Sequence, residues 1–252
     1  MDSTISSDTR FDIIDFNHLS PELDWHRLGA GSFGSVYRAE YLGLPVAVKE
    51  IFSRTDYNVE KYFARECKIL QEARHPNIVQ YIGLCLAPPG PPKHDYQPDS
   101  DEEENAPPVV GKKARPAAKR ILIISEYLPK GNLRGHLITH ATGPSLSWRL
   151  RLSFAIDITR SIAYLHERRC LHRDLKLENC LITDNFRIKL CDFGFARLEA
   201  KNEEEVRRLS YCGTDGYMSP EILRGEPFGL ATDIYSLGIL FCELITLKLT
   251  GQ

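Results

Sequence analysis

The chain contains 252 residues, of which 42% are apolar and 26% are charged, a composition typical of a globular protein with a sizeable core. Its 32 Lys and Arg residues nearly balance 34 Asp and Glu residues, and the net charge of -2 argues against the basic surface of a nucleic-acid-binding or membrane-surface protein. Cysteines without a CxxC pair, and a polar amino terminus unlike a signal peptide, favour a reducing, cytoplasmic setting.

The first half of the chain predicts a small β-sheet with one helix. A polar leader over residues 1–23 precedes residues 25–51, where short β-type runs alternate with glycines and predict paired antiparallel strands. Residues 58–75 have helical spacing and end before a proline, because the residue before proline disfavours helical backbone angles. Residues 77–86 and 120–128 are two further predicted strands.

Residues 87–119 interrupt this predicted sheet. The stretch is rich in proline, carries the acidic run DSDEEEN followed by the basic run GKKARPAAKR, and lacks the apolar content needed to fold. We interpret it as a disordered insertion. Its basic end leaves a nuclear location as an alternative to a cytoplasmic one, although a solvated linker is the simpler interpretation because short Lys/Arg clusters are common.

The second half of the chain is predicted to be helical. Apolar residues recur with helical spacing from Leu150 to Leu165, and Ser147 is placed to cap this helix. The most apolar segment, residues 233–246, is too short to cross a bilayer and carries Glu243, so it predicts a buried helix. A sheet-rich lobe followed by a helical lobe leaves a cleft between them, where ligands commonly bind.

The stretch LGAGSFGSV places Gly29, Gly31 and Gly34 in G-x-G-x-x-G spacing, which dinucleotide sites share with many turns. A dinucleotide site needs a helix directly after the glycines, whereas the following SVYRAEYLGLPVAVKEI is rich in β-branched and aromatic residues. The loop is therefore predicted to join two strands and to cover phosphates with its backbone. A dinucleotide-dependent oxidoreductase is disfavoured because no β-α-β unit follows.

The run PVAVK predicts a strand with two different faces. The two-residue period puts Ala47 and Lys49 on one face and Val46 and Val48 on the other, so one face offers a small apolar contact and a cation to a nucleotide. In the next predicted helix, Glu66 falls on an apolar stripe, where a carboxylate needs a cationic partner such as Lys49. An exposed lysine and a surface-facing glutamate are the alternatives.

The stretch CLHRDLKLENCLI, residues 170–182, places charged groups inside an apolar run, and CDFG follows it. Asp174, Asn179 and Asp192 supply oxygen ligands and a candidate base. Mg²⁺ prefers oxygen ligands and often completes its shell with substrate phosphates. A turn rich in Asp and Asn would explain either motif alone, but both motifs after a glycine loop and a Lys/Glu pair favour a site for metal and phosphate.

In this order, the motifs resemble those of the eukaryotic protein kinases, serine/threonine type. The resemblance runs from about Trp25 to the last residues and implies an α+β, two-lobed kinase domain over residues 24–252, with an antiparallel β-rich N-lobe (24–128) and a helical C-lobe (129–252). It implies ATP and Mg²⁺ as cofactors and protein substrates with Ser or Thr acceptors. The runs VYRAEYLGLPVAVKEI and GTDGYMSPE resemble those of the tyrosine-kinase-like group of serine/threonine kinases.

The resemblance also implies roles in phosphoryl transfer, position by position. Asp174 would be the catalytic base for the substrate hydroxyl. Lys49 would hold the α- and β-phosphates and pair with Glu66, while Asn179 and Asp192 would bind Mg²⁺.

The remaining implied residues concern the acceptor and the nucleotide. Lys176, two residues after Asp174, and Thr214 in YCGTDGYMSPE resemble the serine/threonine pattern, and Ser125 would be the gatekeeper. The residues implied to contact the nucleotide are Leu28, Gly29, Gly31, Gly34, Val36, Ala47, Lys49, Glu126, Leu128 and Leu181, with the adenine between Val36, Ala47 and Leu181 and its edge on the backbone of Glu126 and Leu128.

A phosphorylated activation segment is a further expectation. Family geometry brings Arg173 and Arg197 toward this segment, where a phosphate would gain charge-assisted hydrogen bonds. In RRLSYCGT, Ser210 is the first candidate acceptor and Tyr211 the second, and a loop serine without a role is the alternative.

The resemblance departs from the family at the carboxyl terminus. Kinases of this family continue through further helices, one of which supplies an arginine to the glutamate matching Glu221. The C-lobe is therefore expected to be incomplete after the helix that contains Asp233, with part of that helix's apolar surface exposed.

Taken together, the sequence predicts an ATP- and Mg²⁺-dependent protein serine/threonine kinase. The alternative is a catalytically impaired nucleotide-binding scaffold or a kinase fragment, which would bind nucleotide without transferring phosphate. No nucleic-acid partner and no membrane span are expected, and the oligomeric state stays open.

Overall fold

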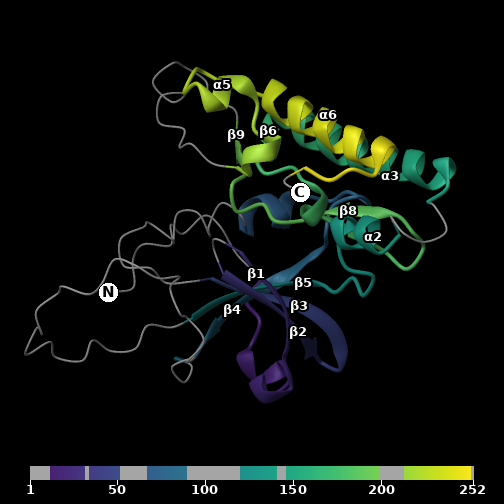
Figure 1. Cartoon of the computed structure of the whole chain (residues 1–252). Coiled ribbons are helices and arrows are strands. Elements are labelled where there is room, and N and C mark those ends of the chain that lie inside the picture. Colours follow the sequence, from purple (N-terminus) through teal and green to yellow (C-terminus); the bar gives the residue numbers. More distant parts are fainter. Residues whose placement is uncertain are drawn as a thin grey trace, which may run out of the picture.

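The structure is a computed structural model of the chain, and it describes residues 12–31, 34–51, 67–89, 120–140, 146–198 and 213–250. The predictions for Glu66, Ser210 and Tyr211, and for residues 90–119 of the insertion, concern residues outside these ranges. In Figure 1 a sheet-rich lobe lies on one side of the molecule and a helical lobe on the other.

The N-lobe is built on an antiparallel sheet in which the strand order is β1-β2-β3-β5-β4. This confirms the antiparallel strands predicted over residues 25–51. A two-residue turn joins β2 to β3, where Leu42 and Gly43 have φ of 51° and 81°, the left-handed pair typical of tight hairpins. The strands are β1 (His26–Gly31), β2 (Gly34–Tyr41), β3 (Leu44–Ile51), β4 (Tyr81–Ala87) and β5 (Arg120–Glu126).

The two faces of this sheet bury different cores. On the face toward the helical lobe, Ile51, Leu84 and Ile123 join the main hydrophobic cluster. On the opposite face, which we call the outer face, Val46 and Val48 belong to a second cluster together with Ala39, Cys85, Ala87, Leu122 and Ile124. Alternation along β3 therefore gives each face its own set of side chains, as the PVAVK pattern predicted.

Residues 12–25, which we call the N-terminal strap, cover the outer face. The strap contains the short 3-10 helices η1 (Phe16–His18) and η2 (Glu22–Asp24) and lies on the side of the sheet away from the helical lobe (Figure 1). Ile14, Leu19 and Trp25 are buried in the outer cluster. At the sheet edge, Ile14 N donates to Leu84 O (2.7 Å) and Leu84 N donates to Asp12 O (2.8 Å).

The sequence predicted a polar leader up to residue 23, whereas the structure places residues 12–23 on the sheet. Only scattered positions of this segment, Ile14 and Leu19 among them, are apolar and buried, so no helical or strand periodicity marks it. The apolar outer face of the sheet recruits these side chains, because burying each of them removes apolar surface from water.

The C-lobe is mainly helical. Its longest helix, α3 (Trp148–Glu167), begins at the cap Ser147, whose Oγ accepts a hydrogen bond from Leu150 N at 3.3 Å, as the sequence predicted. The other helices are α2 (Leu133–His140), α5 (Pro220–Leu223) and α6 (Ala231–Thr246). Two small antiparallel pairs accompany them, β6 (Cys170–Leu171) with β9 (Arg197–Leu198) and β7 (Cys180–Ile182) with β8 (Ile188–Leu190).

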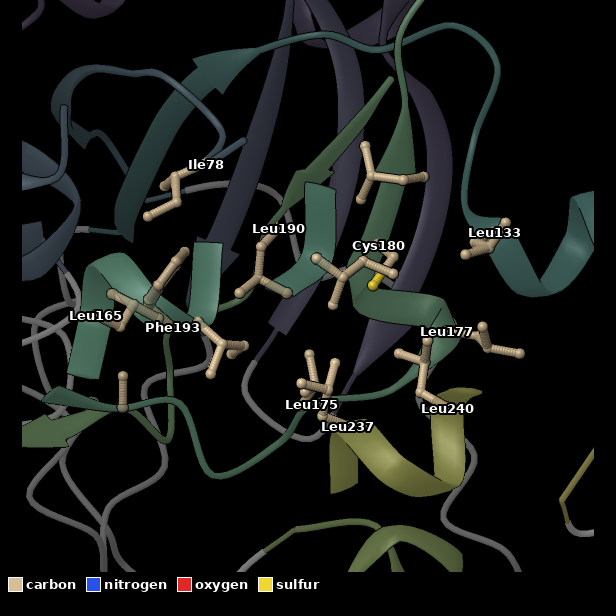
Figure 2. Packing of buried hydrophobic residues seen from close by; sticks show 14 of the residues in the cluster. Ile78, Leu133, Leu165, Leu175, Leu177, Cys180, Leu190, Phe193, Leu237 and Leu240 are labelled. Carbon is tan, nitrogen blue, oxygen red and sulfur yellow. The ribbon is translucent and has the colours of Figure 1, made fainter. Parts of the chain in front are cut away.

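The main core lies between α3, α6 and the loop that carries the polar motifs. Leu165 of α3, Leu190 of β8 and Leu240 of α6 point into it (Figure 2), and Phe193 from the CDFG motif is fully buried there. Each such side chain contributes roughly 1.5–3 kcal/mol when it is buried. Because the residues beside the polar motifs are packed in this core, the core restrains the backbone of the motifs.

Helix α6 is the buried helix that the sequence predicted, with two acids on its buried face. Asp233 and Glu243 are 1% and 2% exposed. Glu243 accepts hydrogen bonds from Tyr217 Oη (2.6 Å) and Thr250 N (2.7 Å), which compensates its burial. The opposite side of α6 exposes Ile234, Tyr235 and Ile245. None of the helices within the described ranges combines the length and the apolarity that a membrane crossing requires.

Candidate active site

The glycine loop joins β1 to β2, as predicted. Gly29 and Gly31 belong to β1, and Gly31 pairs with Gly34 at the start of β2. A Cβ atom at Gly34 would lie 1.9 Å from the carbonyl oxygen of Glu50 on β3, so only glycine allows this close approach. The loop therefore ends in backbone contact with the strand that carries Lys49.

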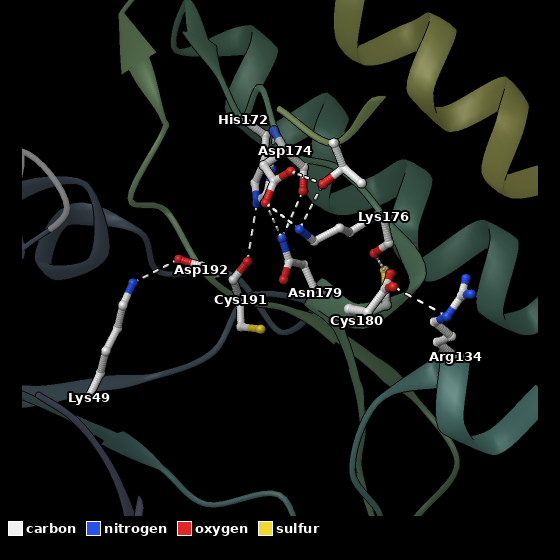
Figure 3. Close-up of polar contacts among 11 residues, drawn as sticks. Lys49, Arg134, His172, Asp174, Lys176, Asn179, Cys180, Cys191 and Asp192 are labelled. Atoms are coloured by element: carbon white, nitrogen blue, oxygen red, sulfur yellow. Dashed lines mark hydrogen bonds and ion pairs between the residues drawn. The ribbon is translucent and has the colours of Figure 1, made fainter. Parts of the chain in front are cut away.

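Lys49 connects the two lobes. Its Nζ lies 2.7 Å from Oδ1 of Asp192, and Figure 3 shows the lysine reaching from the sheet to the loop of the helical lobe. Asp192 has φ of 60°, in the left-handed region that Asp tolerates better than most residues. The strand alternation thus places Lys49 on the face of β3 toward the helical lobe, as the sequence predicted.

The charge of Asp192 is set by opposing effects. Burial by itself would raise the pKa of the carboxyl group, but the Lys49 ammonium and its hydrogen bond, with a smaller contribution from the Gly194 amide, hold the pKa below the usual value. The group is therefore a carboxylate at neutral pH and a good oxygen ligand.

Asp174 is almost completely buried and accepts three hydrogen bonds from side chains. Thr214 Oγ1 donates to Oδ1 (2.8 Å), while Lys176 Nζ (2.9 Å) and Asn179 Nδ2 (3.1 Å) both contact Oδ2. Lys176 Nζ also donates to Thr214 Oγ1 at 2.8 Å, which closes the cluster. Asp174 and Asn179, which the sequence predicted to belong to one site, are thus in direct contact, and Lys176 joins them (Figure 3).

The backbone under this cluster is held by Asp233 of α6. Its carboxylate accepts hydrogen bonds from His172 N (2.8 Å) and Arg173 N (2.9 Å), and His166 Nε2 lies 2.9 Å away. Arg173 has φ of 68°, a strained conformation that these two bonds help to maintain. Asp233 therefore fixes the turn from which Asp174 projects.

His172 joins the two polar motifs. Its Nδ1 accepts from the Asp174 amide (3.3 Å), and its Nε2 lies 3.2 Å from the carbonyl oxygen of Cys191, so the neutral imidazole with a proton on Nε2 satisfies both contacts. The Cys191 amide donates to Asn179 O at 2.9 Å. These bonds hold Asn179 and Asp192 in one unit.

The donor set fits a divalent cation of the magnesium type. Asp192 offers a carboxylate and Asn179 an amide oxygen, which are hard ligands. Within the described ranges no group of three or more His, Cys, Asp or Glu residues is arranged to hold a metal, so substrate phosphates or water would have to supply the other ligands.

The predicted nucleotide-contacting residues are distributed over both lobes. Val36 lies opposite Lys49 in the β2–β3 register and Ala47 lies opposite Ser125, while Leu28 on β1 is half exposed. Leu181 comes from β7 of the other lobe and forms a bridge to Asn132. Three strands of the N-lobe, β1, β2 and β3, and the distant strand β7 of the C-lobe thus contribute these positions.

The segment between the lobes is held by Glu126 at the end of β5. Its amide donates to Gln80 O (3.0 Å), and its carboxylate accepts from Gln80 N (2.7 Å) and forms an ion pair with Lys189 of β8. The backbone N–H of Glu126 is therefore already bonded to the Gln80 carbonyl oxygen, and Leu128 lies two residues beyond the end of β5.

Sequence reasoning missed the supporting roles of His172, Asp233 and Lys189. Asp233 had a detectable signal, because a charged residue on the buried stripe of an apolar helix requires hydrogen-bond partners. His172 and Lys189 gave no comparable signal, since a single histidine or lysine beside a motif has many possible environments.

Comparisons with known proteins agree with this geometry. The protein kinase domain family matches residues 24–251. The chain is 34% identical over 244 residues to the RasGEF domain-containing serine/threonine-protein kinase X of Dictyostelium discoideum. The aligned region is 97% of the chain and 21% of that protein.

Two further relatives have similar identities. The serine/threonine-protein kinase CTR1 of Arabidopsis thaliana is 36% identical over 226 residues, 88% of the chain and 24% of that protein. The probable serine/threonine-protein kinase kinY of Dictyostelium discoideum is 36% identical over 226 residues, 88% of the chain and 36% of that protein. The chain thus spans a minor part of the length of these relatives.

Proposed function

The chain belongs to the protein kinase family, and we propose that it transfers the γ-phosphoryl group of ATP to Ser or Thr hydroxyls of protein substrates. Two groups of contacts carry this proposal. Asp174 is bound by Lys176, Asn179 and Thr214, and Lys49 of the sheet forms an ion pair with Asp192 of the helical lobe, as Figure 3 shows for the labelled pair. The three relatives named above are all called serine/threonine-protein kinases, which supports the same acceptor class.

Asp174 is the proposed base. Its Oδ1 already accepts a hydrogen bond from an aliphatic hydroxyl, that of Thr214, at 2.8 Å. A substrate Ser or Thr hydroxyl has the same chemistry, so this contact supports Asp174 as the group that orients the attacking oxygen and accepts its proton. Lys176 and Asn179 contact the other carboxylate oxygen, Oδ2, and so restrain the orientation of the Asp174 side chain.

Lys176 is proposed to have a second role. Its ammonium lies within 2.9 Å of both Asp174 and Thr214, which places a positive charge beside the proposed base. Because the transition state spreads negative charge over the phosphoryl oxygens, a preorganised cation there stabilises it.

Lys49 is proposed to hold the α- and β-phosphates, and the glycine backbone from Gly29 to Gly34 to cover them. Asn179 and Asp192 would hold Mg²⁺, which, when bound, offsets the phosphate charge. Lys49 Nζ and Asp192 Oδ1 lie 2.7 Å apart, so the residues proposed to hold the phosphates and the cation are already adjacent.

The test is transfer of labelled phosphate from ATP with Mg²⁺ to a generic Ser/Thr protein substrate. We expect transfer by the wild-type chain and a loss of about a thousandfold in Asp174→Asn, the range for removing an acid-base group. A folded wild-type chain that binds ATP without transferring phosphate would support the scaffold alternative. Phosphate found only on tyrosine would contradict the proposed acceptor.

A further inference from the structure

One arginine joins the N-terminal strap to the catalytic sheet. Arg120, the first residue of β5, donates from Nη1 to Glu22 Oε2 of the strap (3.0 Å) and to Glu50 Oε1 of β3 (3.1 Å). Its Nη2 forms a second bond to Glu22, and its Nε donates to Pro88 O just beyond β4 (3.0 Å). Four separate chain segments therefore meet at a single guanidinium.

This contact is shielded from solvent more than a typical surface ion pair. The side chains of Arg120, Glu50 and Glu22 are 14%, 10% and 28% exposed. Burial alone would lower the pKa of Arg120, but the hydrogen bonds to both glutamates raise it, so the charge is retained. Forked contacts of this kind fix orientation as well as distance.

Glu50 transmits this contact to the nucleotide side of the sheet. Its side chain points to the outer face and contacts Arg120, while the preceding residue, Lys49, points toward Asp192 of the helical lobe. Its carbonyl oxygen is the atom that a Cβ at Gly34 would strike, so the end of the glycine loop rests on the same residue. A shift of the Glu50 backbone would therefore displace both Lys49 and the loop.

We propose that Arg120 is a positioning residue for nucleotide binding, holding Glu50, and through it Lys49 and the glycine loop, against the N-terminal strap. This inference rests on the proposed function, in which Lys49 contacts the phosphates of ATP. It adds residues 12–25 to the parts of the chain on which ATP affinity depends.

A purely structural role makes a different prediction. If Arg120 only stabilised the fold, its loss would lower the thermal midpoint and leave the ATP affinity of the folded protein unchanged. If Arg120 acts through β3, its loss weakens ATP binding in folded protein, and part of that loss requires Lys49.

The experiment compares Arg120→Gln and Arg120→Lys with the control Glu40→Gln, an exposed acid on β2 of the same sheet. The dissociation constant of ATP with Mg²⁺ is measured by calorimetric titration of each folded protein, with KM and kcat of phosphate transfer beside it. We expect Arg120→Gln to raise the dissociation constant and KM about tenfold and kcat to change by less than about twofold. Arg120→Lys should recover part of the affinity, and the control should match wild type.

The deciding measurement repeats Arg120→Gln in a Lys49→Met background. There we expect the effect on ATP affinity to shrink from about tenfold to about threefold or less, because the lysine through which the arginine acts is gone and only the contact to the glycine loop remains. An unchanged tenfold effect in that background, or wild-type affinity in the single variant, would overturn the proposal.

If Arg120→Gln does not fold, Glu22→Gln replaces it, since this change keeps the arginine and weakens only the link to the strap. Its expected effect on ATP affinity is about threefold, and no change would count against the proposal. Wild-type protein that binds ATP but transfers no phosphate would refute the proposed function while leaving the affinity test intact. Wild-type protein that binds no ATP would overturn both.

Discussion

Asp157 and Asp174 are both buried carboxylates of the C-lobe, yet they are bound in different ways. Asp157, on α3, is held by the fork of Arg187, with Nε at 2.8 Å, and by the Ile188 amide at 3.0 Å. Asp174 is bound by a hydroxyl, an ammonium and an amide group, all on side chains.

This difference distinguishes a structural carboxylate from one that can react. A backbone N–H cannot move away without disturbing the fold, and the planar fork of Arg187 adds two directed bonds, so Asp157 ties the β7–β8 hairpin to α3. The partners of Asp174 can rotate, which lets a substrate hydroxyl take the place of one of them. Burial alone is therefore a poor guide to function, and the nature of the partners is more informative.

The largest expected effect is on the free energy of unfolding, when the partner of Asp157 is removed. Arg187→Met leaves the Asp157 carboxylate buried with one remaining hydrogen bond. The free energy of unfolding should fall by about 3 kcal/mol, the lower end for a broken buried pair because Arg187 is half exposed. Urea unfolding measures this, with Arg187→Lys as the control that keeps the charge. Loss of phosphate transfer in protein that is still folded would contradict the structural role.

The next effect concerns the hydroxyl that binds Asp174. Thr214→Ala removes the donor to Oδ1 and the acceptor of Lys176, so kcat/KM should fall by about thirtyfold, or about 2 kcal/mol, typical of a hydrogen bond to a charged group. Thr214→Ser keeps the hydroxyl and should retain most activity. Steady-state kinetics of the two variants test this. Equal losses in both would show that the methyl group, not the hydroxyl, matters.

A smaller effect is expected on the stability of Asp174→Asn. The asparagine keeps an acceptor oxygen, and the Thr214 hydroxyl can rotate to accept from the new amide, so the free energy of unfolding should change by at most about 1 kcal/mol. Chemical denaturation of the inactive variant beside wild type measures this. A loss as large as that of Arg187→Met would place Asp174 with the structural carboxylates.

The smallest effect is expected where an ion pair is only partly buried. Lys189 and Glu126 are 21% and 24% exposed, so Lys189→Gln should cost less than about 1 kcal/mol of stability. The backbone N–H of Gln80 still donates to the Glu126 carboxylate in this variant. Thermal unfolding of both proteins at low and high salt checks the prediction. If the ion pair stabilises the protein, the difference in thermal midpoint between wild type and Lys189→Gln should shrink at high salt, because salt screens the two charges.

Much of the candidate site could be predicted because its motifs are local. Ala47 and Lys49 share a face of one strand, and Asp174 and Asn179 lie five residues apart in a single loop, so their proximity follows from short-range geometry. The glycine spacing and the β-rich run after it predicted a loop between strands, which the structure confirms.

Contacts between distant residues could not be predicted in this way. Thr214 meets Asp174 across 40 positions, Asp233 meets His172 across 61, and Arg120 meets Glu22 across 98. No local pattern encodes such a pairing, because it depends on how helices and sheet pack after their faces are buried.

Hydrophobic periodicity and short spacings were enough to predict a sheet-rich half followed by a helical half and a glycine loop between strands, and the family resemblance supplied the roles of the catalytic residues. The partners that hold the buried charges, and the packing of residues 12–25 on the outer face of the sheet, follow instead from how the elements pack in three dimensions. A buried carboxylate or an apolar sheet face requires a partner, but the partner it obtains is whichever group the folded chain brings within hydrogen-bond or van der Waals distance.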